Sequence, residues 1–311
     1  MVSSVPRVSI GMPLYNAERY MREAIDSILA QTFSDFELII SDNASTDRTQ
    51  EIALEYVAKD PRVRYFRNDR NRGAAYNYNR VIELARGEYF RHAAYDDILA
   101  PTNIERCVEE LDRCPECALA YPRMTTIDAQ GRPLKQFQDS LDIRLPTPHE
   151  RYRRFNRLCD PGKMCDPVFG LFRMSVLRRT KMIQPFASAD VFLLLETALR
   201  GEIHEVPEYL FFERWHDQGS VLANQTFESR AAWFDTEKKG KWWIYLPHWR
   251  WVIEHIRSIF RLEASLIEKL MCCTDLYYVL WENKRGLLTD LTALFEHLMH
   301  PSKPVSVAGR L

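Results

Sequence analysis

The sequence predicts an α/β protein, with a doubly wound sheet of the nucleotide-binding type in its first half and a helical extension at its carboxyl terminus. Runs of β-branched and aromatic residues alternate with helical patterns over roughly the first hundred residues, as in a parallel sheet covered by helices. Polar residues follow each of these runs, at the sheet edge where such folds bind ligands. After about residue 231 the composition becomes aromatic and helical.

Four parallel strands with connecting helices are predicted in the first half. The strands are expected at 8–12, 36–40, 63–66 and 88–91. Asn16 is expected to cap a helix that runs to about Gln31, and Ser45 or Thr46 to cap the next one. A third helix is expected after Gly73.

The second half changes pattern. It predicts a turn at 127–131, strands at 168–172 and 209–215, and a helix at 190–199. The polar, proline-bearing stretch 136–149 is expected to be a mobile loop. We expect two domains, a first one over 1–225 and a helical, aromatic-rich extension over 226–311.

The composition is that of an ordinary globular protein. Of the 311 residues 46% are hydrophobic and 27% are charged, and the net charge of −1 provides no basic field for nucleic acid. No secretory signal is recognisable, and no run approaches the ~20 apolar residues of a membrane span. We therefore expect a cytoplasmic protein, with contact to the inner face of a membrane left open.

The seven cysteines argue against a disulfide framework, because their number is odd and their spacing is irregular. Cys114 and Cys117 form a C-x-x-C pair, which in other contexts serves redox or zinc chemistry. This pair follows a helical pattern and has no second pair to complete a zinc site. We expect these cysteines to be structural.

Asp96 and Asp97 are the first candidates for chemistry. Two adjacent carboxylates just past a buried strand repel each other unless a cation or hydrogen-bond donors offset the repulsion. A divalent ion held by one or two carboxylates and diphosphate oxygens is the usual arrangement in nucleotide chemistry. An acidic pair at a helix start is the alternative, and these two residues alone do not decide between them.

Four polar motifs occur in order, each at the end of a predicted strand. They are Pro13-Leu14-Tyr15-Asn16, Ser41-Asp42-Asn43-Ala44-Ser45-Thr46-Asp47, Asn71-Arg72-Gly73 with Asn79, and Tyr95-Asp96-Asp97-Ile98-Leu99. As an ordered set they resemble the family 2 glycosyltransferases, which have the GT-A fold, over about residues 5–220. The chain departs from the family at Asn43-Ala44, where Gly-Ser is usual, and at Ala94, where an acidic residue is usual. These departures leave the identity of the nucleotide base open.

The resemblance implies roles for the residues of the nucleotide pocket. Pro13 and Tyr15 would line the base and ribose pocket, and Asp42 would accept a hydrogen bond from the base. Asn71 and Gly73 would shape the wall beside the nucleotide.

For the acidic pair, the resemblance implies that Asp96 lies near the ribose and that Asp97 binds the metal ion on the diphosphate. Asn79 would brace the loop at Asn71–Gly73. His216 and Arg214 resemble an Arg-x-His element of the family, which implies a metal or diphosphate contact for His216 and a diphosphate contact for Arg214. A purely structural histidine is the alternative for His216.

Asp190 opens a leucine-rich helical pattern. A helix N-cap is the alternative to a catalytic role for a carboxylate at this position. In the family an acidic residue at this point is the general base of an inverting displacement. The family usually has Glu-Asp, whereas Ala189 precedes the aspartate here.

The expected activity is therefore that of a metal-dependent hexosyltransferase that uses Mg²⁺ or Mn²⁺. The donor would be a UDP-, dTDP- or GDP-sugar, and the acceptor a glycan, a glycolipid or a lipid-linked sugar. Two alternatives remain: a nucleotide-sugar-binding module without transfer activity, and a sugar nucleotidyltransferase. The latter would need a loop rich in glycine and basic residues after the first strand, where this chain has Pro13–Asn16.

The carboxyl-terminal extension contains an apolar stripe at helical spacing. Its members are Trp249, Val252, Ile253, Ile256, Ile259 and Phe260. We expect the stripe to pack on the first domain or on a second subunit. A membrane surface is the alternative, because Trp242 and Trp243 follow a group of lysines, a composition typical of interfacial helices.

Overall fold

The computed structural model describes residues 5–137, 141–158, 166–217, 219, 227–236 and 246–299. Within these residues the strands form one mixed sheet of nine strands, ordered β3-β2-β1-β4-β8-β6-β9-β5, with β7 paired to β6. The strands are β1 (Val8–Leu14), β2 (Phe36–Asp42), β3 (Val63–Arg67), β4 (Tyr89–His92), β5 (Ile98–Leu99), β6 (Cys117–Ile127), β7 (Pro133–Gln136), β8 (Leu171–Arg173) and β9 (Glu202–Arg214).

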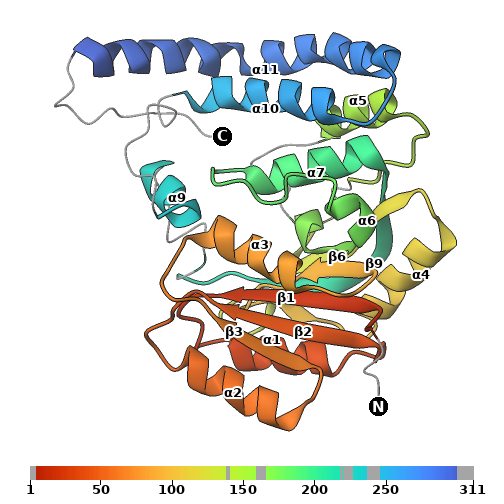
Figure 1. Cartoon of the computed structure of the whole chain (residues 1–311), viewed down its shortest axis with the longest axis vertical. Helices are drawn as coiled ribbons and strands as arrows, with labels where there is room; N and C mark the ends of the chain where they lie inside the picture. Colours follow the sequence, from red (N-terminus) through yellow and green to blue (C-terminus); the bar gives the residue numbers. More distant parts are fainter. Residues whose placement is uncertain are drawn as a thin grey trace.

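The helices lie in layers on both faces of this sheet. They are α1 (Met21–Leu29), α2 (Thr49–Lys59), α3 (Ala74–Leu84), α4 (Asn103–Arg113), α5 (Pro148–Leu158), α6 (Met174–Leu177), α7 (Ala189–Arg200), α9 (Phe227–Phe234), α10 (Pro247–Arg261) and α11 (Leu266–Met299), with a 3₁₀ turn at Asp166–Phe169. α1 and α2 cover one face, and α3, α6 and α7 cover the other (Figure 1). α10 and α11 form a further layer beyond α7.

The predicted α/β class is confirmed, and so are the first four strands. β1, β2, β3 and β4 are parallel, as the alternating pattern indicated. Successive side chains point to opposite faces of the sheet. In β2, Leu38 and Ile40 therefore enter the core under α1 and α2, whereas Ile39 enters the core under α3 and α7.

The first helix starts later than predicted. α1 begins at Met21, because Asn16 has a left-handed backbone (φ 52°) and does not cap it. The side chain of Asn16 instead accepts a hydrogen bond from the Thr46 amide at 2.9 Å, which joins the loops after β1 and β2. Neither Ser45 nor Thr46 caps α2; the Asp47 carboxylate accepts the Thr49 amide at 3.0 Å.

The expectation of a mobile loop over 136–149 is wrong for most of the described part of this stretch. Ile143 and Ile203 exchange two backbone hydrogen bonds, at 2.8 and 3.1 Å, and the Leu141 amide donates to the Tyr121 hydroxyl at 2.7 Å. Leu141 and Ile143 are fully buried. Because the residues around these two positions are polar, the sequence alone did not indicate a buried segment here. Residues 138–140 lie outside the described part.

Two other strand expectations need correction. The predicted strand 168–172 is a 3₁₀ turn over Asp166–Phe169 followed by β8, and the predicted strand 209–215 is the second half of the longer β9. The predicted helix 190–199 is α7, and the predicted turn 127–131 joins β6 to β7.

The apolar stripe of α10 packs partly against the rest of the chain. Val252 and Ile259 are buried, whereas Ile256 and Phe260 are exposed. On α7, Phe192 contacts the rings of Trp251 and His255, with centroid distances of 4.7 and 5.3 Å. Trp242 and Trp243 lie outside the described residues. Among the described helices, none combines the length and the apolar character that crossing a membrane requires.

Asp290 of α11 caps α10 from outside that helix. α10 has no side-chain cap of its own at Leu246, and the buried Asp290 carboxylate accepts the backbone amides of His248 and Trp249 at 2.8 and 3.2 Å. It also lies 2.8 Å from Nδ1 of His248. An anion at a helix amino terminus is favoured by the free amides and by the helix dipole. Asp290 therefore sets how α10 and α11 pair.

Replacing Asp290 with Ala should lower the free energy of unfolding by about 2 kcal/mol, because two helix amides and a buried imidazole lose their acceptor. Denaturant unfolding of the parent and the variant measures this change. Thr289→Ala on the exposed side of α11 is the matched control. Equal stability of Asp290→Ala and the parent would refute the capping role.

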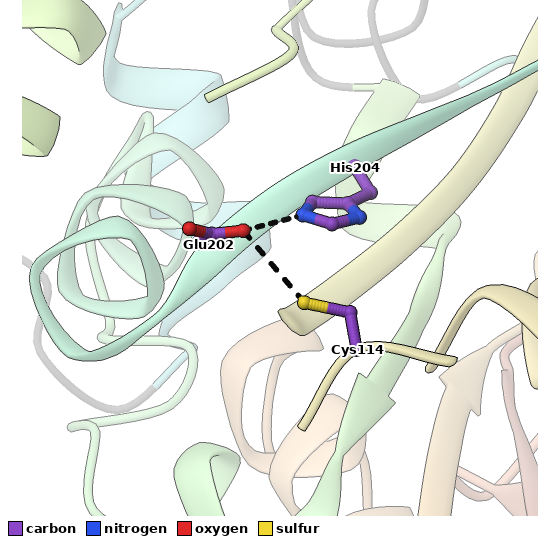
Figure 2. Close-up of side chains that lie close together, drawn as sticks. All are labelled: Cys114, Glu202 and His204. Carbon is purple, nitrogen blue, oxygen red and sulfur yellow. Dashed lines mark hydrogen bonds and ion pairs between the residues drawn. The ribbon is translucent and has the colours of Figure 1, made fainter. Parts of the chain in front are cut away.

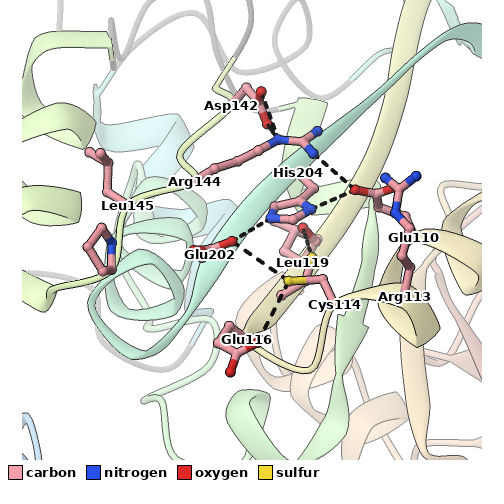
Figure 3. Close-up of polar contacts among 12 residues, drawn as sticks. Glu110, Arg113, Cys114, Glu116, Leu119, Asp142, Arg144, Leu145, Glu202 and His204 are labelled. Atoms are coloured by element: carbon pink, nitrogen blue, oxygen red, sulfur yellow. Dashed lines mark hydrogen bonds and ion pairs between the residues drawn. The ribbon is translucent and has the colours of Figure 1, made fainter.

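His204, near the start of β9, lies between two carboxylates. Its Nδ1 is 2.6 Å from Glu110 of α4, and its Nε2 is 2.7 Å from Glu202 (Figure 3). Each ring nitrogen of His204 is therefore at hydrogen-bond distance from a carboxylate. Cys114 lies 3.8 Å from Glu202, and with His204 the three side chains have the spacing of a metal site (Figure 2). The two short contacts are hydrogen-bond distances, so we interpret the group as an ionic clamp between α4 and β9.

His204→Leu should destabilise the fold by about 3 kcal/mol, because Glu110 and Glu202 remain half buried without their shared partner. The melting temperature of the parent should be the same with and without Zn²⁺. A rise in melting temperature that is specific to Zn²⁺ and is lost in Cys114→Ser would show a metal site instead of a clamp.

Candidate active site

The carboxyl ends of the parallel strands bring the predicted polar residues to one edge of the sheet. Pro13 lies in β1 opposite Ser41 of β2, and Tyr15 follows β1 with its side chain half exposed. Asp42 ends β2, and Asp96 and Asp97 follow β4. The loops after the strands therefore surround one region, as expected for a doubly wound sheet.

Asp42 is fully buried and strongly hydrogen-bonded. One carboxylate oxygen accepts the Ser45 amide at 2.8 Å, and the other accepts the Tyr65 hydroxyl at 2.7 Å and the Arg67 guanidinium at 2.5 Å. Burial, followed by the hydrogen bond to Asp42, raises the pKa of Tyr65 to about 12. These contacts fix the Asp42 carboxylate in one orientation.

Asn43 joins the loops after β2 and β3. Its side chain donates to the Asn71 side chain at 2.9 Å and to the Gly73 carbonyl at 3.2 Å. Gly73 has φ 85°, and a Cβ there would lie 2.6 Å from the Phe234 carbonyl oxygen at the end of α9. Thr236 donates to the Asn71 carbonyl at 3.1 Å. The extension thus reaches the wall formed by Asn71 and Gly73.

Asn79 does not brace the loop at Asn71–Gly73, contrary to what the resemblance implied; the side chain of Asn43 contacts that loop instead. Asn77 is buried and donates to the carbonyls of Leu14 and Ser41 at 3.2 and 2.8 Å. Asn79 makes a two-way contact with the backbone of Ile183, at 2.8 and 3.0 Å. It therefore ties α3 to the segment that leads into α7.

The acidic pair is held by the end of β9. The Arg214 amide donates to Asp97 at 2.9 Å, and its guanidinium donates to the Asp96 carbonyl at 2.9 Å and to Glu23 at 2.7 Å. His216 Nε2 lies 2.8 Å from the Asp96 carboxylate. The Arg214 side chain is buried and its contacts are with the protein, so it orients the acidic pair instead of reaching a diphosphate as expected.

Tyr78 of α3 shows that Asp190 lies with the acidic pair. Burial raises the pKa of Tyr78, and the negative charges of Asp96, Asp97 and Asp190 raise it further. The charges of Asp96 and Asp97, in the loop after β4, and of Asp190, in the first turn of α7, therefore all act on one phenol. Such a concentration of negative charge is the environment that a divalent cation stabilises.

Asp190 is the second residue of α7 and is half buried. Ser188, just before the helix, has a left-handed backbone with φ 65°, and one carboxylate oxygen of Asp190 accepts the Val191 amide at 3.0 Å. This local contact is compatible with both readings of the sequence, a cap and a catalytic carboxylate.

Two further residues at the site were missed from the sequence. His92 ends β4 under Tyr78, with ring centroids 5.1 Å apart, and burial lowers its pKa to about 3. His92 is therefore neutral and packs against the ring of Tyr78. Glu213 of β9 has a pKa raised by burial and then by Asp96. Neither has a sequence signal, because each becomes part of the site only through strand pairing.

The metal-capable group of Cys114, Glu202 and His204 is remote from this site. Glu202 begins β9 and Arg214 ends it, so the strand separates the two places by up to roughly 40 Å at 3.3 Å per residue. The groups suited to a hard divalent ion at the sheet edge are Asp96, Asp97 and His216.

Two solved structures share this fold. A crystal structure of S. aureus TarS in complex with UDP-GlcNAc aligns with a TM-score of 0.62 at 14% identity, covering 93% of this chain and 81% of that chain. The mannosyltransferase PcManGT from Pyrobaculum calidifontis, in complex with GDP-Man and Mn²⁺, aligns with a TM-score of 0.52 at 16% identity, covering 97% and 89%. They confirm the predicted GT-A fold with carboxyl-terminal helices.

Curated relatives match part of the chain. Chondroitin synthase from Escherichia coli is 37% identical over 127 residues, which cover 41% of this chain and 18% of the relative. An uncharacterized glycosyltransferase from Methanocaldococcus jannaschii is 35% identical over 135 residues, covering 43% and 47%. The chain thus spans less than half the length of these relatives. The profile of glycosyl transferase family 2 matches residues 9–180, more than half of the chain. The chain belongs to glycosyl transferase family 2.

Proposed function

We propose that the chain is an inverting, metal-dependent hexosyltransferase that moves a hexosyl group from a nucleotide-diphosphate sugar to an acceptor hydroxyl. The observation that carries the proposal is that the charges of Asp96, Asp97 and Asp190 all act on Tyr78. It supports a candidate base near a candidate cation site, which is the pair of groups that a single displacement at a sugar carbon requires.

Asp190 is proposed to be the general base. It takes the proton from the acceptor hydroxyl while that oxygen attacks the sugar carbon on the side opposite the diphosphate, which inverts the configuration. The Val191 amide and the two-way contact between Asn79 and Ile183 hold the start of α7 in place. They reduce the reorganisation needed before the proton moves.

Asp97, with His216 and Asp96 beside it, is proposed to hold Mg²⁺ or Mn²⁺. The donor set of carboxylates and one imidazole, surrounded by excess negative charge, fits such an ion. A bound ion neutralises charge on the leaving diphosphate. Asp96 is also proposed to lie near the ribose, and Arg214 keeps both aspartates in position.

The nucleotide pocket is proposed to comprise Pro13, Tyr15, Asp42, Asn71 and Gly73. Tyr15 offers a half-exposed ring for the base, and the fixed Asp42 carboxylate offers a preorganised acceptor. Asn71 and Gly73 form a wall that Asn43 and α9 support.

The donor is proposed to be a UDP-, dTDP- or GDP-linked hexose, and the acceptor a glycan, a glycolipid or a lipid-linked sugar. TarS, which binds UDP-GlcNAc, and PcManGT, which binds GDP-Man and Mn²⁺, support a nucleotide-sugar donor. We assign the donor site to a domain over 1–225 and a border of that site to the extension over 226–311, since Thr236 contacts Asn71. A membrane surface and a second copy of the chain are the candidate partners of the extension.

A nucleotide-sugar-binding module without transfer activity is the main alternative, and it differs in one measurement. The transferase releases nucleoside diphosphate from its donor when an acceptor is present, whereas a binding module releases none. A sugar nucleotidyltransferase would instead form pyrophosphate or consume it.

Asp97→Ala should abolish the dependence of nucleotide binding on Mn²⁺, because the ion loses a ligand between the protein and the diphosphate. Calorimetry with UDP, dTDP and GDP, each with and without Mn²⁺, measures this. Asp35→Ala, at an exposed carboxylate in the α1–β2 connection, is the control and should behave like the parent. Affinity that Mn²⁺ still enhances in Asp97→Ala would contradict the assignment.

Asp190→Asn should keep donor affinity and lose transfer by about 10²–10⁴-fold, because an amide still accepts the Val191 amide but takes no proton. Product formation under single-turnover conditions gives the rate, and calorimetry gives the donor affinity. The melting temperature should be unchanged. Transfer at the parental rate would reduce Asp190 to a helix cap.

A further inference from the structure

One side of α11 is apolar and exposed over the whole length of the helix. α11 has 34 residues, about 50 Å at 1.5 Å per residue. Twelve of its large apolar side chains are exposed: Leu266, Ile267, Leu270, Met271, Tyr277, Tyr278, Leu280, Trp281, Leu288, Leu291, Phe295 and Met299. Isolated exposed apolar residues are common, but a continuous patch of this kind marks an interaction surface.

The opposite side of α11 already has a partner within the chain. Cys272, Val279, Leu287 and Ala293 are buried, and Asp290 caps α10. α11 packs on α10 and α5 (Figure 1). The packing of α11 on α10 and α5 therefore uses the opposite side of the helix and leaves the exposed side uncovered by them.

The positions along the middle of the exposed side recur every seven residues, in steps of three and four. Its central positions are Ile267, Leu270, Thr274, Tyr277, Trp281, Lys284, Leu288, Leu291 and Phe295 in the sequence. This is the spacing of the a and d positions of a coiled coil. A helix that rests on a flat surface shows a similar spacing, so the charges of α11 must distinguish the two.

The charges of α11 favour a protein partner over a membrane surface. The helix contains five acidic and three basic residues. An interfacial helix that docks on anionic lipid is rich in lysine and arginine beside its apolar face. Here Lys284 stands within the stripe, with its ammonium 3.3 Å from the centroid of the Trp281 ring.

We propose that the chain forms a two-fold symmetric dimer in which α11 packs antiparallel against α11 of a second copy. Trp281 and Lys284 indicate that the two copies of α11 run antiparallel to each other. In a parallel pair each Lys284 would face the same lysine of the partner copy across the interface, and like charges repel. In the antiparallel pair centred between them, Lys284 faces the partner copy's tryptophan ring, a cation–π contact.

This register also matches the rest of the stripe. It places Tyr277 opposite Leu288, Thr274 opposite Leu291, and Leu270 opposite Phe295. Each copy then contributes the same surface, as two-fold symmetry requires. The exposed parts of these side chains amount to on the order of 800 Å² per copy, the size of a standard specific interface.

The first test is the molar mass in solution. Light scattering after gel filtration of the full chain should give a dimer. The double variant Leu288→Glu/Leu291→Glu should weaken the dimer by about 100-fold or more and give a monomer, because two carboxylates enter an apolar interface. Both side chains are exposed, so the melting temperature of the monomer should be close to that of the parent diluted below its dimer dissociation constant. Leu54→Glu, at an exposed leucine of α2, is the matched control and should stay dimeric.

The second test is whether the two copies of α11 pack antiparallel or parallel. In a Cys273→Ser background, Thr274→Cys/Leu291→Cys should form a disulfide-linked dimer on mild oxidation. Thr274→Cys alone should not, because in the antiparallel register it faces Leu291 of the second copy. Cross-linking of the single variant would mean a parallel pair and would overturn the proposed register.

Four results would overturn the dimer. The parent would stay monomeric up to about 100 μM, or Leu288→Glu/Leu291→Glu would stay dimeric, or a monomeric parent would co-sediment with vesicles of phosphatidylglycerol and phosphatidylcholine. The fourth is a parent that dimerises only after removal of residues 300–311, since those residues would then be the occupant of the stripe. The interface does not rest on the proposed function, and nucleotide affinity measured on the same samples separates the two.

Discussion

The hold of the end of β9 on the adjacent carboxylates Asp96 and Asp97 is the constraint on which the site depends. Two adjacent carboxylates repel each other unless hydrogen-bond donors or a cation offset the repulsion. Arg214 donates to the Asp97 side chain and the Asp96 carbonyl, and His216 contacts the Asp96 carboxylate. These contacts fix the acidic pair in one arrangement at the edge of the sheet.

The position of Asp190 depends in turn on the carboxyl-terminal helices. Glu196 of α7 is buried, accepts the Lys181 amide at 2.7 Å and lies 3.1 Å from the Ser258 hydroxyl of α10. Arg261 of α10 reaches the same carboxylate at 3.3 Å. α10 is itself capped by Asp290 of α11, so a line of buried polar contacts joins α11 to α7, the helix that carries Asp190. The extension thus supports α7, in addition to contacting Asn71 through Thr236.

The sequence predicted those parts of the molecule that local patterns determine. The β-rich run at 36–40 sufficed to predict a strand, and the acidic pair after 88–91 sufficed to predict one site motif. The roles of Asn77 and Arg214 were beyond reach, because both depend on which loops the sheet order brings together. The stretch 136–149 read as a loop because the pairing of Ile143 with Ile203 spans sixty residues and leaves two apolar positions as its only trace. Periodicity found the stripe of α10, but the longer heptad stripe of α11 became meaningful only once its opposite side proved to be buried.

The two sides of α11 have different roles. On one, Asp290 and Leu287 are tied to α10, since the indole of Trp249 donates to the Leu287 carbonyl at 3.1 Å. On the other, Leu288 and Leu291 have no part in that packing and are exposed. Because adjacent positions of one helix point in different directions, substitutions one residue apart separate support of α7 from assembly. In the proposed dimer, the helix that braces each catalytic domain is also the helix that joins the two copies, so association would stiffen α11 and, through α10, the start of α7 where Asp190 lies.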